Sequence, residues 1–221
     1  MAGIQDFAEF VDDFWGADTY STAGQGTPWA VADTSVAGAP TVANVTPSAT
    51  GEVAITLAAT LEVENVFLSF GDTLSFDIDN LQSFEARVKV SGCTTGTTIS
   101  WGLASARNDT PSTIANRALF RMTGATSTTA ITIETDDNTT DSGLIATGAT
   151  LGTTYKKFVI DFTGGKSNVR FYVDGVRVAT STTMSLVGFT ASLQPFFQIQ
   201  KAANTNVDSI SIDYIRVAMK R

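Results

Sequence analysis

The stretch YKKFVIDFTGGKSNVRFYVDGVRVAT, residues 155–180, decides the fold of this chain. In 157–163 and again in 169–173 every second residue is large and apolar. Successive side chains of a strand point to opposite faces, so each segment places its apolar residues on one face. Asp174-Gly175 follows the second segment and supplies the positive φ that a two-residue hairpin turn needs. The stretch therefore predicts antiparallel strands packed on a core.

The rest of the chain repeats this pattern of short strands and glycine turns. The segment DSISIDYIRV, 208–217, alternates in the same way and closes the domain. Further strands are predicted at 29–33, 53–59, 63–70, 74–78, 84–91, 97–104, 114–122, 130–135, 177–181 and 196–201. Many short strands at this spacing are typical of a sandwich or barrel. We predict a single antiparallel, all-β sandwich domain over residues 27–221.

Composition excludes several kinds of chemistry. The 221 residues carry a net charge of -8, and an acidic surface repels nucleic-acid phosphates and anionic lipid. Histidine is absent, which excludes Ser-His-Asp catalysis, Cys-His catalysis and histidine-ligated metals. Cys93 is the single cysteine, so no internal disulfide forms, and we interpret it as an incidental small residue. We expect no direct nucleic-acid binding and no membrane span.

Residues 1–26 are interpreted as an N-terminal segment that docks on a partner. Its apolar residues recur at helical spacing between acidic ones, which predicts an amphipathic helix. The alternative is a coil that feeds a first strand at 9–15. The predicted docking residues are Ile4, Phe7, Phe10, Val11 and Phe14. The segment has no basic region followed by a long apolar run, so we expect no secretory signal.

The strand residues resemble the concanavalin A-like lectin/glucanase superfamily, including laminin-G-like jelly rolls. The resemblance is carried by Tyr155, FVIDF at 158–162, VRFYVDGVRVA at 169–179, IDYIRV at 212–217, and, in the opening region, FVDDFWG at 10–16 and Trp29. It implies a jelly-roll sandwich. It implies less about function, because this fold hosts enzymes, lectins and structural modules.

Glycoside hydrolysis is one function that the resemblance raises. Retaining β-glucanases of this superfamily carry Glu-x-Asp-x-x-Glu on one strand, where two carboxyl groups act as nucleophile and acid. The nearest match is ETDDNT at 134–139, in which Glu134 and Asp136 fit the first two places. Thr139, or Asn138 at a shorter spacing, cannot supply the second acid. We favour the alternative that Glu134 ends a strand and that an Asx-rich turn follows.

Calcium is a second hypothesis, because lectins of this superfamily use it to shape a sugar-binding edge. Asp136, Asp137, Asn138 and Asp141 could offer several oxygens from one loop. Their spacing matches no loop motif that we can name, so a solvated acidic turn is the favoured interpretation. No other cofactor is expected.

Glycan binding is the third hypothesis, because sugars stack on exposed aromatic rings. Tyr20 and Trp29 flank a glycine-rich loop and are the predicted contacts. Trp15 and Trp101 are also available, although alternation in 99–103 favours a buried Trp101. This hypothesis gives the alternative function, a lectin-like module that adheres to a cell-surface glycan.

The function favoured from sequence is a non-enzymatic structural protein of a phage virion, for example a capsid decoration protein. A chain without histidine, disulfides or a secretion signal, rich in Thr and Gly, resembles such modules. The expected partners are capsid or other virion proteins and further copies of the chain. The expected location is the virion exterior. A glycan-binding module is the alternative, and a glycoside hydrolase is third.

Overall fold

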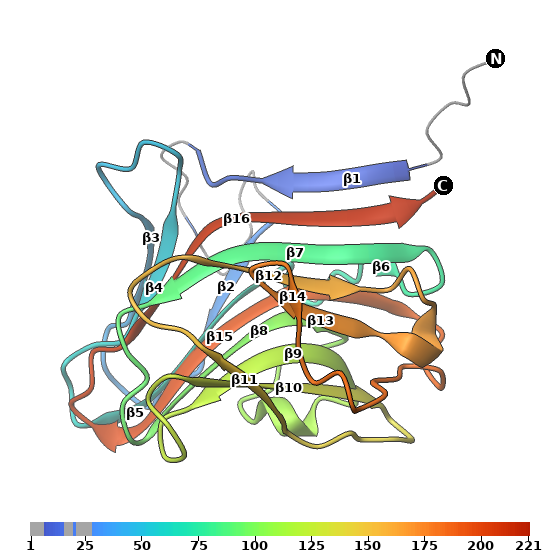
Figure 1. Cartoon of the computed structure of the whole chain (residues 1–221). Helices are drawn as coiled ribbons and strands as arrows, with labels where there is room; N and C mark the ends of the chain where they lie inside the picture. The colour runs from blue at the N-terminus through green and yellow to red at the C-terminus, as the bar shows by residue number, and fades with distance from the viewer. Residues whose placement is uncertain (1–6, 16–19, 21–27) are drawn as a thin grey trace.

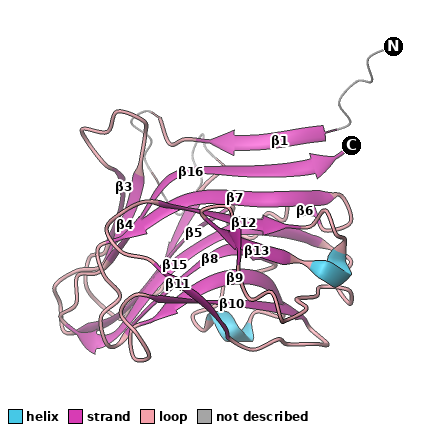
Figure 2. Ribbon diagram, in the orientation of Figure 1, coloured by secondary structure: helices cyan, strands magenta, loops and turns pink. Residues whose placement is uncertain are grey.

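The computed structural model describes residues 7–15, 20 and 28–221, which form two antiparallel sheets of eight strands each. The sheets lie face to face, and only two short 3-10 turns, η1 (Pro111–Thr113) and η2 (Lys166–Asn168), interrupt the strands and loops (Figures 1 and 2). The predicted all-β jelly-roll sandwich is confirmed.

Sheet A contains the stretch 155–180 and the closing strand. Its order is β14 (Val176–Arg177), β13 (Arg170–Val173), β12 (Lys156–Asp161), β7 (Leu81–Val90), β16 (Ser209–Lys220), β4 (Val53–Thr56) and β3 (Thr41–Asn44), with β1 (Phe7–Asp12) also paired to β16. The closing strand β16 therefore lies inside the sheet, paired with β7 along one edge and with β4 and β1 along the other.

Sheet B carries the candidate site. Its order is β11 (Ile145–Thr150), β10 (Ala130–Asp137), β9 (Asn116–Thr123), β8 (Thr97–Ala104), β15 (Ser192–Asn204), β5 (Glu62–Ser69) and β2 (Ala30–Asp33), with β6 (Phe76–Asp77) also paired to β15. The sequence predicted neither β11 nor β3. Both are short edge strands, and neither shows a clear alternation of apolar residues.

The hairpin at 174–175 forms as the sequence predicts. Val173 pairs with Val176, and the two turn residues between them, Asp174 and Gly175, have φ values of 50° and 80°. Positive φ at both central positions is the turn geometry whose twist matches that of the flanking strands. The predicted strand at 177–181 is much shorter in the structure, because β14 ends at Arg177.

The core fills the space between the sheets. Phe158 of β12 is fully buried and lies edge-on to Trp101 of β8, with ring centroids 4.9 Å apart. Trp101 also stacks on Phe120 of β9 at 5.7 Å. The prediction that Trp101 packs in the core is confirmed. No helix among the described residues is long and apolar enough to cross a membrane.

The described part of the N-terminal segment is a strand and not the helix that its spacing predicts. β1 pairs along its length with β16, from Phe7 opposite Lys220 to Asp12 opposite Ile215. Figure 1 shows it lying beside β16 at the rim of the sandwich. The segment forms a strand despite its helical spacing, because Phe10 then reaches the edge of the core beside Phe70, at a ring-centroid distance of 5.3 Å. The alternative of a first strand was the better prediction.

Candidate functional site

The outer face of sheet B carries polar side chains where its inner face carries the core. Along β10, Ile133 points into the core and Glu134 points outward, as alternation requires. The register places Glu134 opposite Leu119 and Asp136 opposite Arg117. Glu134 and Asp136 therefore share the outer face, as the sequence predicted for the first two positions of a glucanase-like motif.

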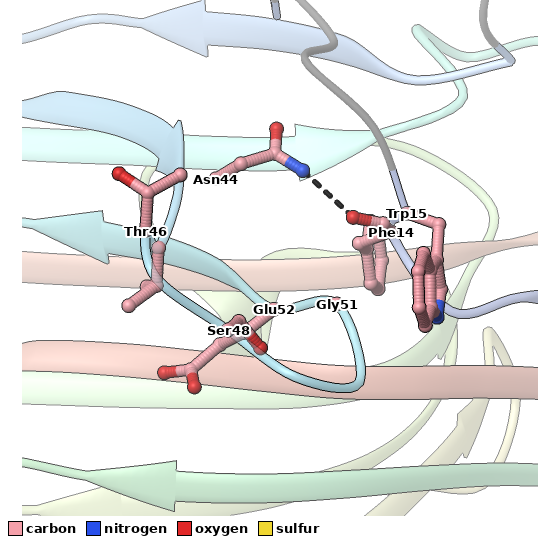
Figure 3. A pocket seen from close by; sticks show the side chains of 8 residues that line it. Phe14, Trp15, Asn44, Thr46, Ser48, Gly51 and Glu52 are labelled. Atoms are coloured by element: carbon pink, nitrogen blue, oxygen red, sulfur yellow. Dashed lines mark hydrogen bonds between the residues drawn. The ribbon is translucent and has the colours of Figure 1, made fainter.

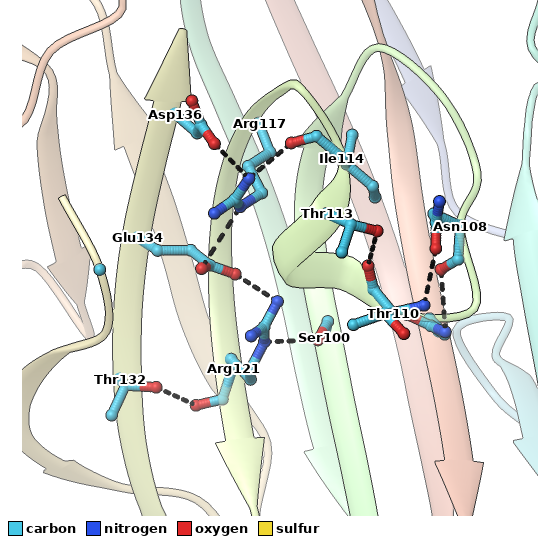
Figure 4. Close-up of polar contacts among 12 residues, drawn as sticks. Ser100, Asn108, Thr110, Thr113, Ile114, Arg117, Arg121, Thr132, Glu134 and Asp136 are labelled. Carbon is cyan, nitrogen blue, oxygen red and sulfur yellow. Dashed lines mark hydrogen bonds and ion pairs between the residues drawn. The ribbon is translucent and has the colours of Figure 1, made fainter. Parts of the chain in front are cut away.

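Two arginines of β9 hold these carboxylates (Figure 4). Arg117 Nε lies 3.3 Å from Glu134 Oε2, and Arg117 Nη1 lies 2.6 Å from Asp136 Oδ2. Arg121 Nη2 contacts the other carboxylate oxygen of Glu134. The side chains of Arg117 and Glu134 are 0% and 1% exposed. Each buried charge thus has a partner of opposite sign, which burial of a charge requires.

Burial sets the electrostatics of this cluster. It raises the pKa of the Glu134 carboxyl above its usual range, although the positive charges of Arg121 and Arg117 act against this. Burial also lowers the pKa of Arg121, with Glu134 acting against it. Glu134 therefore holds its proton to a higher pH than an ordinary glutamate does.

The loop between β8 and β9, residues 105–115, folds over part of this face. Its Ile114 is 2% exposed and packs in a small apolar cluster outside the sheet with Ala32, Phe67, Ala104, Leu119 and Phe196. The carbonyl oxygen of Ile114 accepts a hydrogen bond of 2.5 Å from Arg117 Nη1. The loop is therefore fastened to the face by both apolar packing and the charge cluster.

Two amide side chains on the same face have unused hydrogen-bonding groups. Gln198 Nε2 donates to Asn65 Oδ1 at 2.7 Å, and both residues are buried. Gln198 Oε1 and Asn65 Nδ2 have no hydrogen-bond partner. Both atoms are shielded from solvent, and Gln198 Nε2 also lies 3.4 and 3.3 Å from the carbonyl oxygens of Asn108 and Asp109, so this pair fastens the 105–115 loop to the sheet.

Two hollows lie on the outer face of sheet B. One, of about 290 Å³, lies over β9, β10 and β11 and is lined by Thr123, Thr126, Ser127, Ala130, Thr132, Leu144 and Ala146. The other, of about 190 Å³, lies over β2 and β5 and is lined by Ala32, Thr34, Phe67, Asp72, Arg107, Asn108 and Asp109. Hydroxyl, amide and carboxylate groups beside small apolar surfaces are suited to hydroxyl-rich ligands.

The third position of the glucanase-like motif carries no acid. Asn138 has φ 65° and its N–H donates to Asp136 Oδ1, and the N–H of Thr139 donates to Asp137 Oδ1. The Asx-rich turn predicted from sequence is confirmed, although β10 runs on to Asp137, three residues past Glu134. The two carboxyl groups on the outer face are therefore Glu134 and Asp136.

The structure does not gather the four predicted calcium ligands around one point. Asp136 and Asp141 both contact Arg117. Asp137 points to the other side of β10, where its carboxylate accepts the N–H of Gly188 at 2.7 Å. No three acidic or cysteine side chains in the described ranges are arranged to hold a metal ion. Arg117 is the reason, because its guanidinium already neutralises two of these carboxylates.

The predicted glycan contacts do not form an exposed pair. Trp29 is 1% exposed, and its indole N–H donates to Asp12 Oδ2 at 2.6 Å, so its prediction as a surface group is wrong. Tyr20 is half-buried and packs against the core. Trp29 is buried because it fills the space between Phe14 and Phe70, at centroid distances of 5.4 and 5.0 Å.

The predicted docking residues are divided between core and surface. Phe14 is buried and Phe10 is half-buried against the core, so neither is available to a partner. Phe7 and Val11 are exposed on the outer side of β1. Ile4 lies outside the described residues. Alternation along a strand, and not helical spacing, separates the two sets.

Sequence reasoning missed Arg117 and Arg121, although a signal was present. The two arginines stand four apart with Leu119 between them, which on a strand places all three on one face. The same alternation in β10 places Glu134 and Asp136 on one face. The arginines of β9 and the carboxylates of β10 lie on the same face of the sheet because β9 pairs with β10. A local sequence pattern does not reveal which strands pair.

No family model matches the chain, and no curated protein matches it. Similar solved structures exist. A β-glucanase of Bacillus licheniformis is 15% identical, with a TM-score of 0.59 over 100% of both chains. The GH16 protein of the Bacteroides ovatus mixed-linkage glucan PUL, in complex with a G4G4G3G product, is 10% identical, with a TM-score of 0.63 over 94% of this chain and 99% of that one.

A carbohydrate recognition domain, that of Emp47p, is also similar: it is 12% identical, with a TM-score of 0.54 over 87% of this chain and 88% of that one. These comparisons, together with the two sheets, show that the chain has the jelly-roll fold of the glucanases.

Two functional predictions change with these comparisons. The prediction that the protein is not an enzyme is contradicted, because chains that share its fold over nearly their whole length are glycoside hydrolases. The similar structures are mostly glycan-active, which favours the alternative of carbohydrate binding over a capsid role. Capsid partners and oligomerisation gain no support from them. The location on a virion exterior stays a prediction.

Proposed function

We propose that the protein binds carbohydrate on the outer face of sheet B. The observation that carries the proposal is the hollow over β9, β10 and β11, which is lined by the hydroxyl-bearing residues Thr123, Thr126, Ser127 and Thr132. Sugars present hydroxyl groups that both donate and accept, so they match such a lining.

The hollow over β9, β10 and β11 is the proposed place of first contact. Its wall combines the hydroxyl groups of Thr123, Thr126, Ser127 and Thr132 with the apolar groups of Leu144 and Ala146. This mixture suits a sugar ring, which has polar edges and apolar patches. The net charge of -8 favours neutral glycans over acidic ones.

A second function, hydrolysis of a glycosidic bond, is favoured by one specific observation. Glu134 and Asp136 lie on the same outer face, and burial raises the pKa of Glu134, as an acid catalyst requires. Arginines contact both carboxylate oxygens of Glu134. Hydrolysis therefore requires one of these contacts to be exchanged for the glycosidic oxygen.

A printed glycan array tests the binding proposal, and release of reducing ends from the retained glycans tests hydrolysis. Thr126→Arg places a long side chain in the hollow of about 290 Å³ and should abolish binding at this hollow. Thr128→Arg is the matched control, because Thr128 is exposed on the same turn but does not line the hollow. Retention of no glycan by the unaltered protein would refute the proposal. Reducing ends that appear with the unaltered protein and not with Glu134→Gln would support hydrolysis.

A further inference from the structure

A second pocket lies on the opposite sheet, where the N-terminal segment meets the turn between β3 and β4. It has a volume of about 80 Å³ and is lined by Phe14, Trp15, Asn44, Val45, Thr46, Ser48, Gly51 and Glu52. Figure 3 shows the indole of Trp15 beside Phe14, with Ser48 and Glu52 across from it. None of these residues belongs to sheet B, so the pocket is separate from the proposed site.

Trp15 is the exposed tryptophan of this chain. Its relative exposure is 65%, whereas Trp29 and Trp101, the other two, are 1% and 0% exposed. The face of an exposed indole ring is suited to stack on the apolar face of a sugar ring. The pocket beside Trp15 is too small for a sugar ring and large enough for one ring substituent.

The backbone at Phe14 is held in an unusual conformation that turns Trp15 outward. Phe14 has φ 53°, in the left-handed region that a bulky residue rarely adopts. Its N–H donates to Asp12 Oδ1 at 2.8 Å, and its carbonyl oxygen accepts a bond of 2.7 Å from Asn44 Nδ2. Phe14 is thereby buried while the next residue is exposed. Conformations of this kind concentrate at binding sites, because surrounding contacts must sustain them.

The opposite wall approaches this segment closely because Gly51 has no side chain. Gly51 has φ +81°, and a Cβ there would meet the carbonyl oxygen of Asp13 at 1.9 Å. The wall brings the hydroxyl groups of Thr46 and Ser48 and the carboxylate of Glu52 to the pocket. The pocket thus offers donors and acceptors for a polar substituent beside a ring-sized apolar face.

Its charge restricts the ligand class. Glu52 is 8% exposed and pairs with Lys89 Nζ at 3.0 Å, so the carboxylate at the pocket is compensated and no cation is free to attract an acid. An anionic sugar would meet the net negative charge of the chain. A neutral sugar meets no such repulsion.

We propose that Trp15 and this pocket form a second carbohydrate subsite, in which the ring of a neutral sugar stacks on Trp15 and one polar substituent enters the pocket. This inference rests on the proposed function, since it adds a contact point for the same class of ligand on the other sheet. The Trp15 pocket lies on the sheet opposite the hollow of sheet B, so separate substitutions can test the two sites independently.

The test follows the three indole N–H signals of the full-length protein by NMR. The probes are cellohexaose, xylohexaose, mannohexaose and chitohexaose, with hexagalacturonate as the acidic comparison. At least one neutral probe should shift the indole N–H signal of Trp15. Trp15→Ala should weaken the binding of that probe about tenfold. Trp15→Phe should keep part of the affinity. Phe7→Ala, which removes another exposed aromatic ring of the N-terminal segment, should leave it unchanged.

The outcomes separate this inference from the proposed function. If glycans bind and Thr126→Arg abolishes their binding, but the Trp15 signal stays unshifted and Trp15→Ala binds normally, the second subsite is refuted and the site on sheet B stands. If hexagalacturonate alone shifts the Trp15 signal, the assignment to neutral sugars is refuted. If no probe shifts any indole signal and the array retains nothing, both proposals fail.

Discussion

Arg117 and Glu134 form a buried ion pair between neighbouring strands of sheet B, with Arg117 Nε 3.3 Å from Glu134 Oε2. The pair lies on the outer face of the sheet and not between the sheets, where the core is apolar. Arg117 also contacts Asp136 and Asp141, so one guanidinium holds together the end of β10 and the turn that follows it. Arg117 therefore fixes the end of β10 and the following turn on the outer face of sheet B.

Removal of Arg117 should cost more stability than removal of an exposed arginine. Arg117→Ala leaves Glu134 buried with fewer partners, and we expect the free energy of unfolding to fall by about 3–5 kcal/mol. Arg107→Ala is the control, because its partner Asp72 is 41% exposed and such pairs contribute about 0–1 kcal/mol. Urea denaturation followed by circular dichroism measures both. Losses of equal size would contradict the structural role of Arg117.

The stability supplied by Asp137 should depend on pH. Burial raises the pKa of this carboxyl, but the N–H groups of Gly188, Thr140 and Thr139 donate to it, and its pKa in the folded protein lies below the ordinary value of 3.8. The unfolded chain therefore binds the proton more tightly. The stabilisation is fully present above that ordinary pKa and is lost as the pH falls through the folded-state pKa.

Asp137→Asn should consequently destabilise the protein at pH 7, by about 1–3 kcal/mol. The difference from the unaltered protein should shrink as the pH falls below about 4. Urea denaturation of both proteins at pH 7, 5, 4 and 3 measures this difference. A gap that stays constant over the whole series would show that the ionised carboxylate is not the source of the stabilisation.

Substitution of Gly51 should destabilise the protein, both because an added Cβ would clash and because Gly51 has a positive φ. Gly51→Ala places a Cβ 1.9 Å from the carbonyl oxygen of Asp13, so the turn between β3 and β4 must shift. Gly148→Ala is the matched control, since Gly148 also has a positive φ, +73°, but nothing lies within 4 Å of an added Cβ. We expect Gly51→Ala to be less stable than the control by about 1–3 kcal/mol, as measured by thermal unfolding. Equal stability would contradict the close approach.

Cys93 should be inert in the folded protein. It is fully buried, and burial, with the nearby charge of Asp208, raises the pKa of its thiol to about 12. The thiolate is the reactive form, so a thiol reagent at pH 8 should react only after the protein is unfolded in guanidinium chloride. Complete reaction of the native protein within seconds would show that this part of the core opens readily.

The sequence predicts those strands of the fold in which apolar and polar residues alternate. The strands predicted at 157–163 and 169–173 form in the structure because each of them buries one face. The turn at Asp174-Gly175 forms because both of its residues adopt a positive φ. β1 was harder, because its apolar residues fit both a helix and a strand until their neighbours are known. Pairing with β16, some two hundred residues later in the chain, decides between them.

The candidate site was less predictable, because its members come from separate strands. Glu134 and Asp136 were identified from a motif, but their partners Arg117 and Arg121 depend on the register of β9. The exposure of Trp15 and the burial of Trp29 depend on Asp12, which accepts from both the Trp29 indole and the Phe14 backbone. No local sequence pattern distinguishes these two tryptophans.

The most direct test of carbohydrate binding is a chemical-shift titration of isotope-labelled protein with neutral oligosaccharides chosen from the glycan array. We predict that backbone amide shifts cluster on β9, β10 and β11, around Thr123, Thr132 and Ala146, which line the hollow on sheet B. Saturable shifts there that Thr126→Arg removes would establish the site. An array that yields no ligand, or a ligand that shifts no amide of these strands, would contradict the account.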